Sequence, residues 1–332
     1  NSKDYSGKTI LHYACRAKDI ETIKYIVSLN QFDFNSKDYS RKTILYDACE
    51  SKDIDIFRYI ISLNKIDINS KDSEGKTVLH YACRSGNLNI VRTLLSNNYF
   101  DFNAKDKSGK NILHYSCESC NTDLVKYIIS LNRIDINSKD NLGKTFLHYG
   151  CESGNVELVK YLVSLNKIDF NSIDNNGKTI LHSACKSGSV DLVEYIISFN
   201  IIDINSKDKN GRSILFDACE SSNTDVIKYI ISFNQIDVNL KDNSEKTILH
   251  YACELKKVNV VKYLISLKNI DINSQCSGKT PLYIAVENCN TEIVRVLITS
   301  QSIDVNFKYE QNKIEQFNYS SHRKNYLEHN EY

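Results

Sequence analysis

The chain has 332 residues, and its 42 basic and 41 acidic residues give a formal net charge of +1. This balance gives the chain as a whole no attraction to nucleic acid, and no apolar run reaches the roughly 18 residues of a membrane-spanning helix. The sequence starts without a methionine or a signal-peptide pattern, so we expect it to be part of a longer chain.

The most regular feature is an aspartate that recurs every 34 residues, at Asp4, Asp38, Asp72, Asp106, Asp140, Asp174, Asp208 and Asp242. A fixed period of this length is typical of a stacked repeat architecture. The spacing predicts a solenoid over residues 1–308 and a polar tail or degenerate cap over 309–332. Its nine repeats are expected at about 4–37, 38–71, 72–105, 106–139, 140–173, 174–207, 208–241, 242–275 and 276–308.

Repeat five shows the predicted elements in chain order. Thr145 predicts the start of a first helix, because its hydroxyl can accept from the first-turn amides, and Gly154 predicts its end in a left-handed conformation. A second helix is expected over about 156–165, with Asn166 as its left-handed end. An extended segment and a turn follow. The sequence therefore predicts an all-α solenoid of helix-turn-helix repeats with projecting, β-hairpin-like fingers.

Several motifs carry a resemblance to a known family. They include the tetrapeptide Thr77-Val78-Leu79-His80, the run Ala-Cys-Arg-Ser-Gly-Asn at 82–87, and recurring Leu-Val-Lys-Tyr-Ile and Asp-Ile-Asn segments. This pattern resembles the ankyrin repeat over residues 1 to about 308. The resemblance implies a curved stack and a non-enzymatic scaffold that binds another protein through finger tips and a concave face of first helices. The alternative is a targeting module of a larger enzyme, channel or ubiquitin-ligase adaptor, with its effector domain outside this chain.

The sequence departs from the family pattern at two repeat positions. The family's proline after the threonine is kept only at Pro281, and the histidine is replaced by Tyr46, Phe216 and Tyr283. The first two replacements lie in matching Tyr/Phe-Asp-Ala-Cys-Glu-Ser stretches, five repeats apart. These changes bear on local stability and leave the predicted fold unchanged.

Eight of the eleven cysteines occupy one repeat position: Cys15, Cys49, Cys83, Cys117, Cys151, Cys185, Cys219 and Cys253. If neighbouring repeats stack helix on helix, equivalent atoms lie about 8–10 Å apart, which exceeds the roughly 7 Å that a disulfide tolerates between Cα atoms. We therefore expect buried free thiols. So many reduced thiols indicate a cytoplasmic or nuclear location.

Six histidines precede these cysteines by three residues: His12, His80, His114, His148, His182 and His250. Such a pair could be half of a zinc site, but the next pair is expected about 10 Å away. The family resemblance instead gives the histidine a structural role, bonding its threonine and tying adjacent fingers together. We predict no metal and no cofactor at these positions.

The stretch that starts at Asp135 and Asn137 is similar to the opening of a calcium-binding loop. A calcium loop also needs an oxygen ligand, a glycine and a glutamate at later positions, where this chain has Lys139, Asp140 and Phe146. We expect these aspartate and asparagine side chains to satisfy backbone groups in the finger turns.

No catalytic motif is present. The chain lacks a P-loop, a glycine-rich dinucleotide fingerprint and a nucleophile elbow. The acids, histidines and cysteines that recur are spread along the repeats, whereas catalysis requires several groups that converge. The sequence predicts neither an enzyme nor a small-molecule substrate.

Basic residues form two series on the fingers. The first is Lys8, Lys42, Lys76, Lys110, Lys144, Lys178, Arg212, Lys246 and Lys279, and the second is Lys3, Lys37, Lys71, Lys105, Lys139, Lys207 and Lys241. They could bind an acidic partner or a nucleic-acid backbone. Eight aspartates beside them and six glutamates on the adjacent helices favour a solvated scaffold instead, so nucleic acid is not the expected partner.

Binding specificity is expected where the repeats differ on an exposed face. Three successive repeats place Tyr81, Tyr115 and Tyr149 after the histidine position, flanked by Arg84, Glu118 and Glu152. Tyrosine and arginine are enriched among interface hot spots. These six residues are our candidate partner-binding surface. The alternative, in which the tyrosines are repeat framework packed against their neighbours, remains open.

Overall fold

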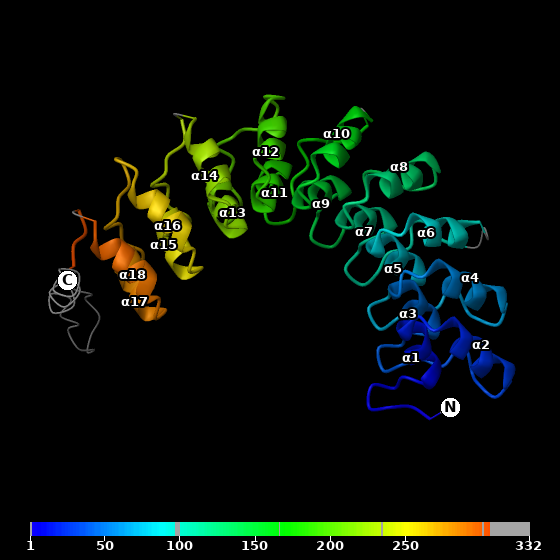
Figure 1. Ribbon diagram of the computed structural model, residues 1–332. Helices are drawn as coiled ribbons and strands as arrows, with labels where there is room; N and C mark the ends of the chain where they lie inside the picture. The colour runs from blue at the N-terminus through cyan, green and yellow to red at the C-terminus, as the bar shows by residue number, and fades with distance from the viewer. Residues whose placement is uncertain (1, 97–99, 166, 234, 301, 306–332) are drawn as a thin grey trace. The chain divides into compact units, whose positions relative to one another are not determined.

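The computed structural model describes residues 2–96, 100–165, 167–233, 235–300 and 302–305. These residues form helices in pairs (Figure 1), joined by turns that contain isolated β-bridges such as Lys139 with Thr145. The chain is therefore all-α, as predicted. The predictions for Asn166 and for the tail over 309–332 lie outside the described residues.

The helices fall into two compact units, Asn1–Asp169 and Phe170–Tyr332. The first unit holds α1 (Ile10–Ala17), α2 (Ile20–Ser28), α3 (Ile44–Glu50), α4 (Ile54–Ser62), α5 (Val78–Ser85), α6 (Leu88–Leu95), α7 (Ile112–Glu118), α8 (Thr122–Ser130), α9 (Phe146–Glu152) and α10 (Val156–Ser164). The second unit holds α11 (Ile180–Ser187), α12 (Val190–Ile197), α13 (Ile214–Ser221), α14 (Thr224–Ile231), α15 (Ile248–Glu254), α16 (Val258–Ile265), α17 (Pro281–Glu287) and α18 (Thr291–Ile298).

Each odd-numbered helix is the first helix of a repeat, and each even-numbered helix is the second. In the first compact unit, α1, α3, α5, α7 and α9 pack one against the next, and each also packs against the second helix of its own repeat (Figure 1). In the second compact unit, α11, α13, α15 and α17 pack in the same way. The predicted helix-turn-helix repeat is therefore confirmed.

Local sequence explains where the helices begin and end. Thr145 is the N-cap of α9 and forms a reciprocal capping arrangement with His148. Gly154 then has φ of 71°, the left-handed conformation that ends a helix. Asn155 caps α10 by accepting from the amide of Leu158. At the ends of second helices, Asn30, Asn64, Asn132 and Asn200 have φ of 51–52°, the conformation predicted for this repeat position.

The core lies between the two helices of a repeat and between neighbouring repeats. In repeat five, Leu147 and Cys151 of α9 and Leu158 and Leu162 of α10 are fully buried. Burying each leucine contributes about 2 kcal/mol of hydrophobic free energy. Gly150 shows how closely the helices approach, because a Cβ atom there would lie 3.1 Å from the Leu162 side chain.

The eight repeated cysteines are fully buried free thiols, as predicted. Burial raises the pKa of Cys15, Cys83 and Cys219 to about 12. These thiols therefore stay protonated at neutral pH and pack as small apolar side chains. None of the helices in the described residues is long and apolar enough to cross a membrane.

Candidate functional site

The finger turns are held by the aspartate that sets the 34-residue period. In repeat five, the Asp140 carboxylate accepts from the backbone amides of Leu142, at 2.9 Å, and Lys144, at 2.8 Å. The backbone amide of Asp140 in turn donates to the Lys144 carbonyl, at 3.0 Å. The prediction that these side chains satisfy backbone groups is therefore confirmed.

The asparagine of the segment that reads Asp, an apolar residue and Asn connects one repeat to the next. The Asn103 side-chain amide donates to the Arg133 carbonyl at 3.1 Å, and its oxygen accepts from the Asp135 backbone amide at 3.1 Å. The same two bonds join Asn35 to Lys65 and Asp67. These bonds make the recurrence of asparagine a structural requirement.

The repeated histidines are buried and bind inside the fold. The backbone amide of Thr9 donates to Nδ1 of His12 at 3.1 Å, and Nε2 lies 3.3 Å from the Lys42 carbonyl of the next finger. His12, and likewise His80 and His250, thus ties its threonine to the adjacent finger, as the resemblance implied. Among the described residues, no group of three or more histidine, cysteine or acidic side chains is arranged to hold a metal ion.

Burial also sets the charge state of four of these histidines. It lowers the pKa of His114 and of His182 to about 4. It also lowers the pKa of His80 and His250 below the usual range. These four imidazole rings are therefore neutral at pH 7 and act as hydrogen-bonding core residues.

The structure brings the predicted tyrosine row together but buries most of it. Tyr115 is 4% exposed and Tyr149 is 5% exposed, whereas Tyr81 is partly exposed. Each phenol donates to the aspartate of its own finger, at 2.8 Å for Tyr81 and 2.6 Å for the other two. The hydroxyls and rings of Tyr115 and Tyr149 are thus engaged within the fold.

The tyrosine rings also pack against the preceding repeat. The ring of Tyr115 meets that of His80 edge-on, with centroids 5.6 Å apart, and Tyr149 meets His114 in the same way at 5.7 Å. Sequence spacing alone does not reveal this contact, because it joins residues of different repeats. Because these contacts engage the tyrosine rings, the accessible part of the candidate surface is the charged residues beside them.

The flanking residues of the candidate surface are accessible. Arg84 is exposed, and the side chains of Glu118 and Glu152 are 27% and 24% exposed. Glu118 pairs with Lys110, and Glu152 pairs with Lys144, both at 2.5 Å. We call the exposed side of these first helices, with Tyr81, Arg84, Glu118 and Glu152, the first-helix face.

Two repeats replace the histidine–tyrosine pair with an aromatic residue and an aspartate. Asp47 and Asp217 are both 2% exposed. Each forms an ion pair with the lysine of the preceding finger, Asp47 with Lys8 at 3.0 Å and Asp217 with Lys178 at 2.7 Å. Burial raises the pKa of Asp47, and it raises the pKa of Asp217 to about 6 even beside Lys178.

Most of the first basic series is neutralised by neighbouring carboxylates. Lys42, Lys110, Lys144, Lys246 and Lys279 each pair with a glutamate eight residues later, at 2.5–3.1 Å. In the second series, Lys3, Lys105 and Lys241 donate to a carbonyl of the next finger. These contacts support the interpretation of both series as scaffold.

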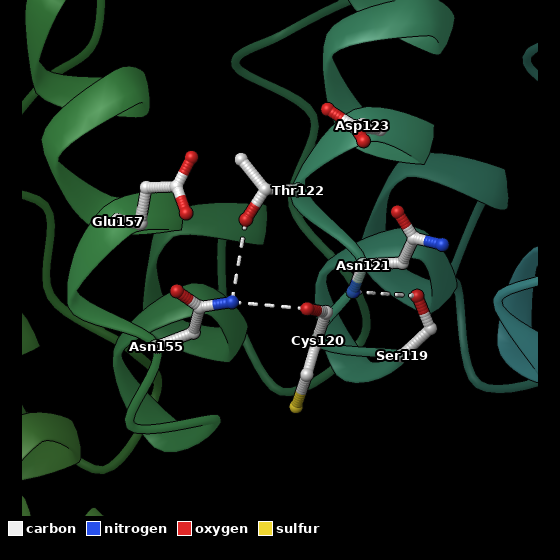
Figure 2. Close-up of a pocket in the computed structure, with 7 residues that line it drawn as sticks. All are labelled: Ser119, Cys120, Asn121, Thr122, Asp123, Asn155 and Glu157. Atoms are coloured by element: carbon white, nitrogen blue, oxygen red, sulfur yellow. Dashed lines mark hydrogen bonds between the residues drawn. The ribbon is translucent and has the colours of Figure 1, made fainter.

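A shallow hollow lies beside the starts of α8 and α10 (Figure 2). Its lining residues are Ser119, Cys120, Asn121, Thr122, Asp123, Asn155 and Glu157. The Asn155 side-chain amide crosses it to donate to the Cys120 carbonyl, at 2.9 Å, and to the Thr122 hydroxyl, at 3.3 Å. Its polar groups therefore serve mainly to connect two repeats.

The same amide contact recurs in both compact units. The asparagine that caps a second helix donates to the preceding repeat from Asn87 at 3.2 Å, Asn121 at 2.7 Å and Asn223 at 2.8 Å. In the sequence, this asparagine stands out only as the last residue of the run at 82–87 and its counterparts. Its recurrence in each run of Ser-Gly-Asn type was the signal for a second role.

Comparison with known protein families finds a family model that matches segments along the chain. The family model described as Ankyrin repeats (3 copies) matches residues 1–72, 45–140, 98–174, 125–208, 147–242, 199–276 and 215–309. A search of curated proteins found no match. The matched segments overlap and extend over the helices of both compact units.

Proposed function

Since the chain belongs to the ankyrin repeat family, whose repeats are in general protein–protein interaction modules, we propose that it is a non-enzymatic scaffold that binds a protein partner through its first-helix face and finger tips. The main support is the distribution of buried and exposed residues. The repeated histidines, the repeated cysteines and most of the tyrosine row are used inside the fold, while Arg84, Glu118 and Glu152 stay accessible on neighbouring repeats.

Buried and exposed parts of the face have different roles in this proposal. Tyr115 and Tyr149 hold the fingers from beneath, and Tyr81 is partly exposed beside Arg84. Partner contact is then made by the charged rim and by Tyr81, a combination of aromatic and arginine side chains that is common at interface hot spots. The finger tips, which differ between repeats, add specificity.

The test compares two triple variants of the full chain. The first is Arg84→Ala with Glu118→Ala and Glu152→Ala on the first-helix face. The second is Lys126→Ala with Glu157→Ala and Lys160→Ala on second helices α8 and α10, as a control. Affinity capture from cell extract identifies the partner, and the purified partner is then titrated against each chain.

We expect the first-helix variant to bind about tenfold or more weakly, which corresponds to about 1.4 kcal/mol, and the control to bind like the unchanged chain. Circular dichroism must show equal helical content in all three proteins. Equal affinity of both variants for the partner would contradict the assignment of the first-helix face.

A further inference from the structure

The charges of the finger turns follow a rule. Each of the nine repeats has one finger cation, the basic residue at the end of the finger turn, and in eight of them it pairs with a carboxylate. The partner is a glutamate of the same repeat in five cases, and an aspartate of the next repeat in three: Asp47, Asp217 and Asp242.

In seven of these eight repeats, the choice of partner follows the residue after the repeated cysteine position. Repeat seven differs, because Arg212 pairs with Asp242 although Glu220 follows its cysteine. Where the residue after this position is glutamate, as at Glu118, the finger cation can pair with it directly. Arg16 and Lys186 occupy this position in repeats one and six, and there the next repeat supplies Asp47 or Asp217. Lys186 also lies 3.4 Å from Glu220. Each basic residue at this position is therefore compensated in these two repeats.

Repeat three breaks the rule. It carries Arg84 after its cysteine, and the next repeat has Tyr115 where an aspartate would be required. Within the described residues, neither Lys76 nor Arg84 forms an ion pair with a carboxylate. The Lys76 ammonium instead lies 5.6 Å from the centre of the Tyr115 ring.

The nearest acids of the neighbouring repeats are already engaged. Glu50 pairs with Lys42 at 3.1 Å, and Glu118 pairs with Lys110 at 2.5 Å. Asp72 and Asp106 bind the amides of their own fingers and the phenols of Tyr81 and Tyr115. The first-helix face therefore carries two uncompensated positive charges at repeat three.

We propose that Lys76 and Arg84 form a recognition site for carboxylate side chains of an acidic segment in the protein partner. This inference rests on the proposed function and specifies the chemistry of the partner. The exposed guanidinium of Arg84 can hold a carboxylate with two parallel hydrogen bonds, and Lys76 adds a point charge supported by the Tyr115 ring.

A protein carboxylate fits this site better than a nucleic-acid backbone. Nucleic acid requires several cations in a row to replace its counterions. The finger cations on both sides of Lys76, Lys42 and Lys110, are paired with glutamates. The positive charge is thus confined to one repeat, which suits a short acidic peptide segment.

The probe is a fluorescein-labelled peptide of eight glutamates, titrated with the full chain at low salt and followed by fluorescence anisotropy. Arg84→Glu should rebuild the lysine–glutamate pair of repeats two, four, five, eight and nine, and we expect it to weaken peptide binding about tenfold. The control, Lys110→Gln with Lys144→Gln, lowers the net charge by the same amount on the same face. We expect it to change peptide affinity less than about twofold.

A gain-of-binding variant provides the reverse test. Glu118→Arg removes the partner of Lys110 and copies the charge arrangement of repeat three onto repeat four, so we expect it to tighten peptide binding about threefold. Glu157→Arg on the second helix α10 makes the same charge change elsewhere and should have no such effect. Helical circular dichroism must match that of the unchanged chain in all these variants.

Several outcomes would overturn the inference. Equal weakening by Arg84→Glu and by the control pair would mean that the peptide senses only net charge. Absence of peptide binding to the unchanged chain would also reject the acidic partner, and tighter binding of a single-stranded DNA oligomer that Arg84→Glu also abolishes would assign the site to phosphates. If a captured partner bound the unchanged chain and Arg84→Glu with equal affinity, this inference would be rejected but the proposed function would stand. If the peptide bound but no protein partner were captured, the proposed function would be rejected but the carboxylate site would stand.

Discussion

Two kinds of repeat hold the basic residue of the preceding finger in different ways. In the histidine–tyrosine repeats three and four, His80-Tyr81 and His114-Tyr115, the phenol binds the finger aspartate and the imidazole contacts the next tyrosine ring. In the aromatic–aspartate repeats two and seven, Tyr46-Asp47 and Phe216-Asp217, a buried carboxylate takes the finger lysine of the preceding repeat directly.

The difference shows that a finger cation can be held by an aromatic ring or by a carboxylate. Lys76 lies 5.6 Å from the centre of the Tyr115 ring, whereas Lys178 lies 2.7 Å from Asp217. The two solutions respond to pH with opposite sign. A neutral buried histidine resists protonation, whereas a buried aspartate favours it.

The largest expected effect is acid destabilisation through the histidines. The pKa of His114 and His182 is about 4 in the folded chain, against about 6.5 when unfolded. The unfolded chain therefore binds more protons between these values, and stability falls as pH decreases from about 6.5 to 4, by on the order of 5 kcal/mol for both together. Urea unfolding at several pH values measures this loss.

His114→Phe sharpens that comparison, because it gives repeat four the aromatic residue found at Phe216. We expect the variant to lose about half of the acid dependence that His114 and His182 contribute. An unchanged pH slope would show that His114 is already protonated in the folded chain or is not buried.

The next effect concerns the framework tyrosines. Tyr149→Ala removes a buried ring and a hydrogen bond to Asp140, and we expect a loss of about 3 kcal/mol in unfolding free energy. Tyr149→Phe keeps the ring and should lose only about 1 kcal/mol. Urea titration followed by the helical circular dichroism signal separates the two. If Tyr149→Ala changed the unfolding free energy negligibly, Tyr149 would be an exposed surface residue and not a buried one.

A smaller effect of opposite sign is expected at Asp217. Its pKa is about 6 in the folded chain, against about 3.9 when unfolded, so the folded chain binds more protons between these values. The stability contributed by this group therefore decreases as pH rises from about 4 to 6, by on the order of 2 kcal/mol. The difference in unfolding free energy between the unchanged chain and Asp217→Asn, measured at several pH values, should show this decrease. The histidines contribute equally in both proteins, so their contributions cancel.

The smallest expected effect is at the partly exposed ion pairs of the finger cations. Lys144→Gln removes the pair with Glu152, and we expect a loss below about 1 kcal/mol. Lys76→Gln, which has no carboxylate partner in the described residues, should change the unfolding free energy even less. If Lys76→Gln were the more damaging change, the charge rule across the repeats would be wrong.

Much of the fold is predictable from the sequence, because the determining contacts are local. Thr145 and Gly154 mark the ends of α9, and Val156–Ser164 forms the second helix where apolar spacing predicts it. The buried cysteines follow from the same period. These features depend on residues within one repeat, where spacing along the chain determines distance in space.

The candidate site was less predictable, because its geometry joins residues of different repeats. The sequence places Tyr115 on the first helix, but its burial depends on His80 of the preceding repeat and on Asp106 of its finger. Lys178 pairs with Asp217, which lies 39 residues further along the chain. The sequence does not give the distance between these two side chains, so it could not show that Lys178 pairs with Asp217 and not with a residue of its own repeat.

The contacts between repeats restrict how such a chain can change in length. The asparagine bonds join residues 30 to 35 positions apart, and the lysine–aspartate pairs join residues 39 apart. Loss or gain of whole repeats in evolution preserves these partnerships, whereas a shorter deletion shifts all of them at one junction. The copying of a five-repeat block would likewise transfer the Lys8–Asp47 arrangement intact to Lys178 and Asp217.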